Sequence, residues 1–489
     1  MANNEVLVKG VNPERPVDAI LVNAPLKNYD LEPRLNNFTL PVLGLGYIAT
    51  YAKCKGHNIG VLDAESLAMG PSKIAKIVNA IAPRWVGFNL LAPTYDLAAT
   101  TASLIDPSIE VVLGGHQAKA MPARIVADGR WPRIDAMILG EAELIFESIL
   151  GDKSSREWLP GVLYRDPLTG SAVMSRLKSG EDPRVWTAPD INSLPFVDRT
   201  FFVQDPFTAE DGRTEASFVG SRGCPYECSF CGAARSANPD ILIRTRDPDG
   251  IVDEMEWCNH LYGVNSVRFV DDLFLASLGF MRSALPRFID RGVAQTFVWD
   301  ATGRINTLSK ADDEMLRIMV KSGCREVALG IESGSQRVLD YVDKHLSPEM
   351  ILHTVAQLTG VGINVKGYVI LGFPGESASE MHATVELIHK LWAIADANRG
   401  EFRCSAFEFR PYPGTKEWHR LMATGRYAED ELLNYAHVDL ADHGTNPKLF
   451  DRDEFNFSVG LQFSDVPLPE VRRMLAELAL AQKARSSHQ

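Results

Sequence analysis

The chain has 489 residues, of which 45% are hydrophobic and 23% charged, and its formal net charge is -13. This length suggests two to four domains, because a single hydrophobic core rarely grows beyond roughly 250–300 residues. A run of about 18 apolar residues, as a membrane span needs, is absent, and residues 1–12 lack the apolar core of a signal peptide. We therefore expect a cytoplasmic protein with no membrane partner. The acidic charge disfavours nucleic acid as a partner; it suits either a cationic small substrate or a merely well-solvated surface.

Short apolar strands alternate with helices over residues 1–150. The clearest helix is predicted over residues 72–82, with Ser72 as its N-terminal cap and Pro83 just after its end. Short buried strands separated by helices predict a doubly wound, Rossmann-like parallel α/β sheet. The strand-like runs are residues 19–22, 59–62, 85–88, 111–113 and 136–139.

Residues 151–210 interrupt this alternation and are predicted to be a linker that contains a hairpin over 161–173. Over residues 211–420 the alternation resumes with six strand–helix units, which favours a partial (β/α)6 barrel over a closed eightfold one. The six strands are predicted near residues 218–220, 267–270, 296–299, 327–329, 365–371 and 404–409.

After Gly414 the sequence becomes acidic and irregular, and it closes with a helix predicted near residues 469–483. We expect residues 421–489 to shape or cap a substrate cavity. Four side chains in this region can reach a substrate or can equally serve the structure: Tyr427, Tyr435, His437 and His443.

Three cysteines follow the first strand of the second domain with the spacing C-x3-C-x2-C: Cys224, Cys228 and Cys231. Thiolates are the usual ligands of iron–sulfur clusters, and three of them leave one iron of a [4Fe–4S] cluster open to a substrate or cofactor. The alternative is a zinc site, which would normally show a second Cys or His pair downstream, and none is visible. The sequence therefore predicts an iron–sulfur cluster, while the four scattered cysteines read as ordinary buried thiols.

With Phe230 directly before its last cysteine, this motif resembles that of the radical S-adenosylmethionine (SAM) superfamily. The resemblance implies that the cluster's open iron chelates SAM and that one electron cleaves SAM to a 5′-deoxyadenosyl radical, which abstracts a hydrogen atom from the substrate. It also implies a reducing partner such as flavodoxin or ferredoxin. The cofactors supply the difficult chemistry, and the protein supplies position and exclusion of water.

The resemblance extends to the carboxyl ends of the later strands, where catalytic groups of βα barrels collect. It implies that an aspartate after the second strand holds the SAM ammonium, although a helix-capping carboxylate is the other interpretation. It implies that Arg304 pairs with the SAM carboxylate, which needs a fixed cation. The end of the fourth strand would contact the methionine and ribose, and the end of the fifth strand would line the adenine. The residues expected to contact SAM are Phe230, Asp271, Asp272, Arg304, Glu332, Ser333, Phe373 and Pro374.

The first 150 residues resemble the cobalamin-binding domain that often precedes this kind of barrel. Ligands of such sheets bind at the carboxyl ends of the strands, near the point where strand order reverses. The Asp-x-His-x-x-Gly signature is absent, so His116 is either a group near the ring or a surface-loop histidine. The expected cobalamin contacts are Thr94, Gly114, Gly115, His116, Gly140 and Glu141.

Together the two domains resemble the class B radical SAM methyltransferases, which implies C-methylation of a small, natural-product-like substrate, as in antibiotic biosynthesis. The alternative is radical dehydration (a lyase reaction), deoxygenation or rearrangement of a sugar or aminosugar without cobalamin. A non-catalytic cobalamin or redox sensor is disfavoured by the intact cysteine motif. A transfer-RNA methylthiolase is disfavoured because residues 1–150 contain only one cysteine, Cys54, and no basic RNA-binding module follows the barrel.

Overall fold

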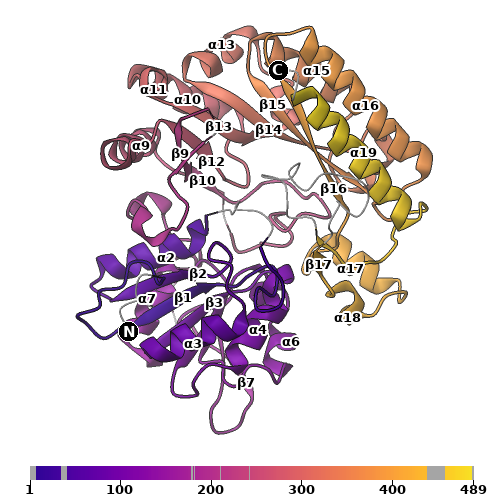
Figure 1. Cartoon of the computed structure of the whole chain (residues 1–489). Coiled ribbons are helices and arrows are strands. Elements are labelled where there is room, and N and C mark those ends of the chain that lie inside the picture. Colours follow the sequence, from indigo (N-terminus) through magenta and orange to yellow (C-terminus); the bar gives the residue numbers. More distant parts are fainter. Residues whose placement is uncertain are drawn as a thin grey trace. The chain divides into compact units, whose positions relative to one another are not determined.

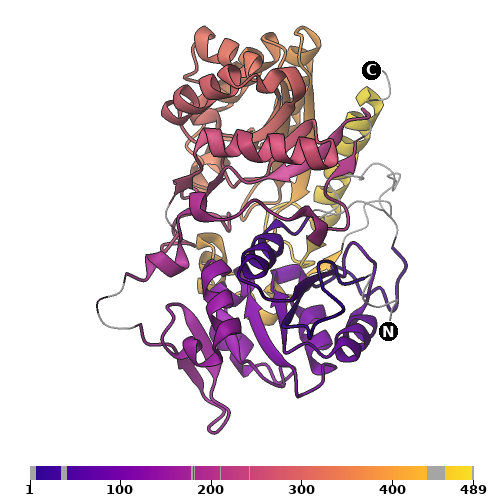
Figure 2. The ribbon, with the colours of Figure 1, turned by 90° about the vertical axis from the view of Figure 1, so that its left-hand side faces the viewer.

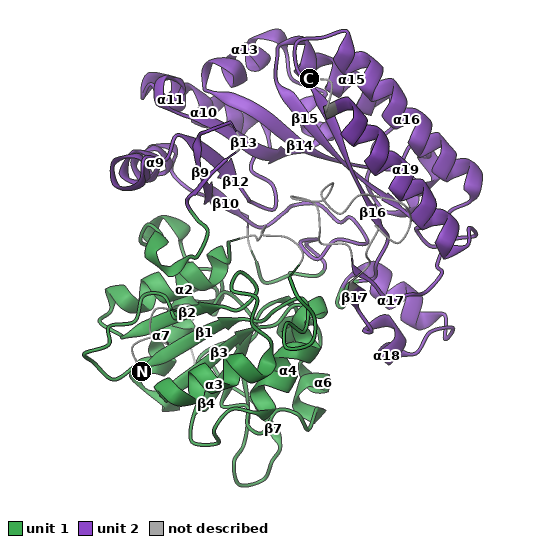
Figure 3. Ribbon diagram, viewed as in Figure 1, with its two compact units in different colours: residues 1–205, 237–242, 412–414 green, residues 206–236, 243–411, 415–489 purple. Residues whose placement is uncertain are grey.

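A computed structural model describes residues 7–34, 41–177, 180, 182–209, 211–241, 243–437 and 457–486. The chain divides into two compact units (Figure 3). Unit 1 consists of Met1–Asp205, Ala237–Leu242 and Tyr412–Gly414, and unit 2 consists of Pro206–Ser236, Ile243–Pro411 and Thr415–Gln489. Within the described ranges, no helix has the length and apolar character that crossing a membrane requires.

Unit 1 is built on a seven-stranded sheet of order β2-β1-β3-β4-β5-β6-β7, in which β1 to β5 run parallel. Apolar side chains of α2 and α7 cover one face of this sheet, and those of α3 and α4 cover the other (Figure 1). Because both faces are covered, the strands are continuous apolar runs, and the predicted doubly wound sheet is confirmed. The strands are β1 (Ala19–Asn23), β2 (Ile59–Asp63), β3 (Trp85–Asn89), β4 (Glu110–Gly114), β5 (Ala136–Ile138), β6 (Val162–Arg165) and β7 (Ala172–Met174). The α-helices are α2 (Leu43–Cys54), α3 (Pro71–Ile81), α4 (Tyr95–Ser103), α5 (His116–Ala120), α6 (Pro122–Ala127), α7 (Glu143–Gly151) and α8 (Arg184–Thr187).

The predicted hairpin is β6 and β7, and it continues the sheet of unit 1 (Figure 2). Strand β6 pairs antiparallel with β5, so that Met137 faces Leu163. The short turn η2 (Lys153–Glu157) precedes this hairpin, and η3 (Ile191–Ser193) and η4 (Arg199–Phe201) follow it, in addition to η1 (Ala92–Thr94) earlier in the unit.

The predicted capping role of Ser72 is wrong. Helix α3 begins one residue earlier, with Pro71 in its first turn and Gly70 at the cap position. The backbone N–H of Ser72 instead donates to the carboxylate of Asp30, at 2.8 Å. A carboxylate brought from a distant loop thus satisfies the helix end, which local sequence could not reveal.

Unit 2 is built on a seven-stranded sheet of order β16-β15-β14-β13-β12-β9-β8. Six of these strands are parallel, and the short β8 pairs antiparallel with β9, which confirms the open half-barrel. The strands of this sheet are β8 (Phe207–Thr208), β9 (Thr214–Phe218), β12 (Ser266–Phe269), β13 (Val298–Gly303), β14 (Cys324–Glu332), β15 (Asn364–Leu371) and β16 (Phe402–Glu408). Two short antiparallel pairs join β10 (Ser221–Arg222) to β11 (Arg244–Thr245) and β17 (Ala436–His437) to β18 (Phe457–Ser458).

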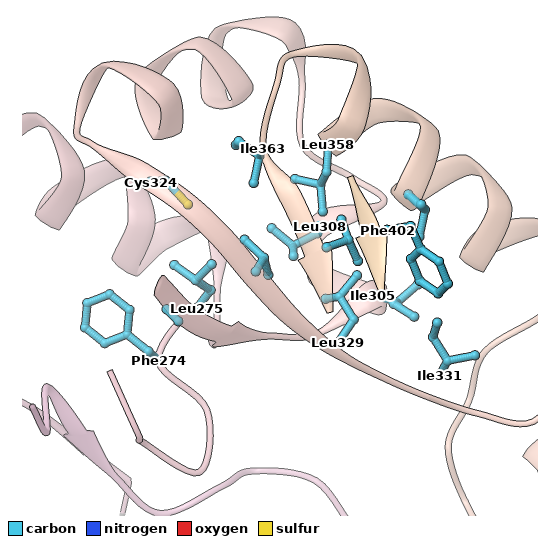
Figure 4. Packing of buried hydrophobic residues seen from close by; sticks show 14 of the residues in the cluster. Phe274, Leu275, Ile305, Leu308, Cys324, Leu329, Ile331, Leu358, Ile363 and Phe402 are labelled. Carbon is cyan, nitrogen blue, oxygen red and sulfur yellow. The ribbon is translucent and has the colours of Figure 1, made fainter. Parts of the chain in front are cut away.

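Helices pack on the outer face of the half-barrel, and Leu329 and Ile331 of β14 belong to the same buried hydrophobic cluster as Leu358 and Ile363 (Figure 4). These residues are almost fully buried, as the alternation of apolar positions along the strands requires. The α-helices of unit 2 as a whole are α9 (Pro248–Tyr262), α10 (Leu278–Asp290), α11 (Val293–Thr296), α12 (Ile305–Leu308), α13 (Asp313–Lys321), α14 (Gln336–Tyr341), α15 (Pro348–Gly360), α16 (Ala378–Asp396), α17 (Lys416–Ala423), α18 (Glu429–Leu432) and α19 (Leu468–Ser486).

The region after Gly414 is less irregular than predicted. Helix α17 begins at once, and the hydroxyl of Thr415 caps it by accepting from the N–H of Trp418 at 3.1 Å. The predicted C-terminal helix is confirmed as α19, whose Gln482 accepts from the backbone of Cys404 in β16 at 2.8 Å. Among the four side chains suggested there, His443 and the side chain of His437 lie outside the described residues.

Candidate active site

The cysteine motif forms one loop directly after β10. Gly223 adopts a left-handed backbone (φ +87°), which turns the chain away from the strand just before Cys224. The pKa of the Cys231 thiol is raised to about 12 and that of Cys224 is also raised; burial is the largest cause for both, and neighbouring Cys228 acts in the same direction. The three thiols thus lie on one loop and influence one another electrostatically.

The three cysteines suit a cluster of several irons. Across the described ranges, no group of three His, Cys, Asp or Glu side chains is arranged to hold a single metal ion. A [4Fe–4S] cluster does not need such a group, because each cysteine binds a different iron. Two buried cations, Arg304 and Lys344, act against the rise in pKa at Cys224 and Cys231 respectively, and positive charge beside a thiol favours the thiolate form that iron requires. The donor set therefore fits the predicted cluster.

Asp271 anchors the start of the cysteine loop. Its buried carboxylate accepts from the backbone N–H of Gly220 at 3.0 Å, from the Ser221 hydroxyl at 2.6 Å, and from the Ser221 N–H. Burial raises the pKa of Asp271 to about 6, although these hydrogen bonds act in the opposite direction. The carboxylate is thus occupied with the loop, and a contact between Asp271 and the SAM ammonium remains a prediction without support from its surroundings.

Asp272, the next residue, is exposed, and its charge raises the pKa of the Cys224 thiol. It therefore lies on the cluster side of β12, and of the two aspartates it is the better placed for a cationic group. The sequence could not separate the pair, because adjacent residues differ only in which side of the chain they face.

The middle of the loop is held from two other elements. The N–H of Ser229 donates to the carbonyl of Val342 at 3.0 Å, and the carbonyl of Ser229 accepts from the N–H of Glu417 at 2.8 Å. Glu417 is fully buried in α17, and its carboxylate also accepts from the hydroxyl of Tyr341 and from Arg420 at 3.0 Å. Sequence reasoning missed Glu417; the capping Thr415 was the available signal for its helix.

Arg304 lies against the cysteine loop. Its Nη1 donates to the sulfur of Cys228 at 3.3 Å, and its guanidinium stacks 3.5 Å from the ring centre of Tyr226. Its Nη2 donates to the carbonyl of Lys344 at 2.8 Å, and its Nε donates to the side chain of Asn306 at 3.1 Å. The predicted contact between Arg304 and the SAM carboxylate remains untested, whereas its contact with a cluster cysteine is direct.

Glu332 forms a buried ion pair with Lys344, whose Nζ lies 2.6 Å from Oε1 of the carboxylate. Glu332 ends β14 in a left-handed backbone conformation (φ +63°). The two residues that flank Lys344, Asp343 (φ +56°) and His345 (φ +54°), also have left-handed backbone conformations. Non-glycine residues held there are strained, and such strain is concentrated at functional sites. A Cβ at Gly330 would lie 2.3 Å from Oε1 of Glu332, so a side chain at this position would displace the ion pair. Lys344 was missed, because nothing in the sequence pairs it with Glu332.

Ser333 follows Glu332 and points toward helix α16. Its buried hydroxyl lies 3.1 Å from that of Thr384 and accepts from the N–H of Ser335 at 3.1 Å. These hydrogen bonds show that the Ser333 hydroxyl serves the local structure, and its contact with SAM remains a prediction.

Phe373 and Pro374 lie in the turn after β15. The Phe373 ring meets that of Phe230 edge-on, with centroids 5.5 Å apart, so the turn packs against the cysteine motif. Oε2 of the buried Glu376 accepts from the N–H groups of Gly372, at 2.8 Å, and Phe373, at 3.1 Å. Burial raises the pKa of Glu376 to about 7, and its Oε1 has no hydrogen-bond partner in the described chain.

In unit 1 the strand order reverses between β1 and β3, so a ligand site is expected beyond their carboxyl ends, at Asn23 and Asn89. Next to them, Gly115 has φ +96°, and a Cβ there would lie 2.5 Å from Oδ1 of Asn89. At Gly114 the nearest atom to a Cβ is a carbonyl oxygen 3.8 Å away. Gly114 therefore presents bare backbone at this edge, which fits the approach of a large flat ring, whereas Gly115 is required by its packing against Asn89.

The other predicted cobalamin residues differ in their surroundings. His116 is exposed at the first position of α5, whereas Thr94 is buried and its hydroxyl bonds to the backbone of Leu91. Gly140 lies beside Thr187, and the N–H of Glu141 donates to the carbonyl of Thr187 at 3.4 Å. Thr94 thus serves the local turn, while His116 remains accessible.

Comparison with known proteins agrees with this geometry. Residues 218–388 match the Radical SAM superfamily, and residues 37–150 match the B12 binding domain. The chain is a radical SAM enzyme with a B12 binding domain. The resemblance predicted from the cysteine motif and from the first 150 residues is thereby confirmed.

Two curated relatives of this radical SAM enzyme are named as methyltransferases. The uncharacterized methyltransferase PH0819 of Pyrococcus horikoshii is 26% identical over 409 residues, which cover 83% of this chain and 84% of the relative. The cytidylyl-2-hydroxyethylphosphonate methyltransferase of Streptomyces wedmorensis is 28% identical and covers 74% of this chain and 75% of the relative.

Among solved structures, the radical SAM methyltransferase TsrM of Kitasatospora setae, bound to tryptophan and a SAM analogue, has a TM-score of 0.62. It is 19% identical to this chain, and the match covers 83% of this chain and 76% of TsrM. The cobalamin-dependent enzyme OxsB has a TM-score of 0.60 at 14% identity and covers 84% of this chain and 61% of OxsB. At these identities the likeness shows a shared fold.

Proposed function

We propose that this chain is a cobalamin-dependent radical SAM methyltransferase that methylates a carbon of a small, natural-product-like molecule. The observation that carries the proposal is the presence of two cofactor domains in one chain, a cysteine loop for a cluster and SAM and a B12 binding domain. The methyltransferase names of the relatives favour methyl transfer over radical dehydration or rearrangement. Fusing the domains makes an encounter of their cofactors intramolecular, which favours reaction between them.

Cys224, Cys228 and Cys231 would hold the [4Fe–4S] cluster, and the edge beside Gly114 and Gly115 would receive cobalamin. When bound, the cluster and SAM supply a hydrogen-abstracting radical, and cobalamin supplies a transferable methyl group. The chain's own residues position these groups and exclude water from them.

The SAM ammonium, the methionine and ribose, and the adenine each have a proposed partner in unit 2. Asp272 would accept from the ammonium, because it is exposed on the cluster side while Asp271 is occupied with the loop. The buried pair of Glu332 and Lys344 would face the methionine and ribose. Phe373, held against Phe230, would line the adenine with Pro374.

The radical reaction needs one electron at a time from outside the chain. We propose flavodoxin or ferredoxin as the donor and the cytoplasm as the compartment, where such donors and reduced thiols coexist.

The experiment is an anaerobic reconstitution with product analysis. Iron, sulfide and cobalamin are quantified on the purified full chain, and the loaded protein is then incubated with SAM and a reductant. Methyl transfer predicts both S-adenosylhomocysteine and 5′-deoxyadenosine, with cobalamin required for the former. Formation of 5′-deoxyadenosine without cobalamin uptake or S-adenosylhomocysteine would overturn the proposal and favour the dehydration or rearrangement alternative. A reconstituted chain that holds no iron would overturn both.

A further inference from the structure

Among the residues that the structure describes, Arg304 is a buried cation without a carboxylate partner. Only 6% of its surface is exposed, and its hydrogen bonds in the described chain go to a cysteine sulfur, a carbonyl and an amide. A buried charge is normally paired with an opposite charge. The one acceptor among these partners that can become an anion is the sulfur of Cys228, 3.3 Å from Nη1.

The guanidinium is held in this position from three sides. The carbonyl of Lys344 and the side chain of Asn306 accept hydrogen bonds from two of its N–H groups, and its central carbon lies 3.5 Å from the ring centre of Tyr226. Tyr226 belongs to the cysteine loop itself, so loop and arginine are fixed together. Such outer contacts are what orients a group against a metal centre.

A cation and an N–H donor beside a cluster sulfur stabilise the reduced cluster, which carries one more negative charge than the oxidised cluster. Reduction of a [4Fe–4S] cluster adds one electron, and the charge spreads onto the thiolates. Hydrogen bonds to the sulfurs and nearby charge are among the factors that set the reduction potential of such clusters. In a buried site the Coulomb attraction is only weakly screened, so its effect on the added electron is large.

We propose that Arg304 is a redox-tuning residue, which donates to the Cys228 thiolate and raises the reduction potential of the cluster. The step concerned is the uptake of a single electron from a low-potential one-electron donor, with no bond formed or broken in the protein. This assigns Arg304 to the cluster instead of the SAM carboxylate. It rests on the proposed function only in that the three cysteines hold a cluster.

The test is a redox titration of the anaerobically reconstituted full chain, without SAM, followed by the electron paramagnetic resonance signal of the reduced cluster. Arg304→Met removes both the charge and the hydrogen bond while keeping a side chain of similar length. We expect iron and sulfide to be retained. At the midpoint potential of the wild type, the ratio of reduced to oxidised cluster should fall by about tenfold or more, equivalent to about 59 mV for a one-electron couple.

Two further variants refine the result. Arg304→Lys restores a charge and should recover part of the shift, whereas Arg287→Met removes an exposed arginine from the surface ion pair of α10 and should leave the midpoint unchanged. If Arg304→Met loses iron, Tyr226→Leu, which removes only the stacking partner, should still lower the midpoint.

An unchanged midpoint potential in Arg304→Met with full iron content would overturn the inference. If that variant also bound SAM more weakly, the result would instead support the predicted contact between Arg304 and the SAM carboxylate. An equal shift in Arg287→Met would also overturn the inference, because the effect would then be one of overall charge. A wild-type chain that holds no cluster would overturn the proposed function instead, so failure of this inference and failure of the proposed function are distinguishable.

Discussion

Glu376→Gln should make the stability of unit 2 less dependent on pH. In the wild type, one carboxylate oxygen accepts from both Gly372 and Phe373, and the other oxygen has no hydrogen-bond partner in the described chain. A glutamine can place its oxygen where the two N–H groups converge and its amide where the unpartnered oxygen was. The substitution therefore removes the charge and retains both hydrogen bonds.

The sign follows from the raised pKa of Glu376, which burial moves from its ordinary value of 4.5 to about 7. Between these values the folded chain binds more protons than the unfolded chain, so the free energy of unfolding falls as pH rises. Between about pH 5.5 and about pH 8.5, this carboxyl alone should lower the free energy of unfolding by about 2 kcal/mol, at about 1.4 kcal/mol per pKa unit.

The assay compares urea unfolding of the wild type and Glu376→Gln at these two pH values. The glutamine variant should gain about 2 kcal/mol relative to the wild type on going from about pH 5.5 to about pH 8.5. Because this is a difference of differences, any packing effect of the amide cancels.

Glu380→Gln is the matched control. Glu380 is paired with Arg337, which holds its pKa at about 2, so its titration lies below the measured range. This variant should lose stability equally at both pH values. A stability difference between Glu376→Gln and the wild type that does not change with pH would refute the reasoning.

Three other outcomes are expected. Asp272→Asn should weaken SAM binding by roughly 10–100-fold, the value of one charged hydrogen bond, with iron content unchanged; equilibrium binding to the reconstituted chain measures it. Cys228→Ala should lose cluster iron by metal analysis, whereas Cys258→Ala, which removes a buried core thiol, should keep it. Gly115→Ala should destabilise unit 1 by more than about 2 kcal/mol and reduce cobalamin uptake, while Gly129→Ala, with no atom within 4 Å of its Cβ, should be neutral in thermal unfolding.

The local sequence pattern was sufficient to predict the strands of the two sheets, because these strands are short apolar runs between amphipathic helices. It was less reliable at element ends. The start of α3 depends on a carboxylate from Asp30, and the start of α17 is held by the hydrogen bond from the N–H of Glu417 to the carbonyl of Ser229 in the cysteine loop. Partners so distant in the sequence leave no periodic signal near the element that they stabilise.

The aspartate pair shows the same limit at the site. From the sequence, Asp271 and Asp272 are equivalent carboxylates after one strand. The fold buries the first among the N–H groups of Gly220 and Ser221 and leaves the second exposed beside Cys224. The facing of adjacent residues depends on the exact register of β12, which is set by pairing with β9 and β13.

The sequence by itself determined the cluster-binding motif, because cluster ligation needs three thiolates at short, fixed spacing and such a motif is fully local. Tertiary structure alone decided which charges surround those thiolates. Arg304 reaches Cys228 from the end of β13, and Lys344 reaches Glu332 from a loop of left-handed residues. Such contacts arise where parallel strands bring their carboxyl ends to one edge, so they depend on how the strands are ordered in the sheet and not on spacing along the chain.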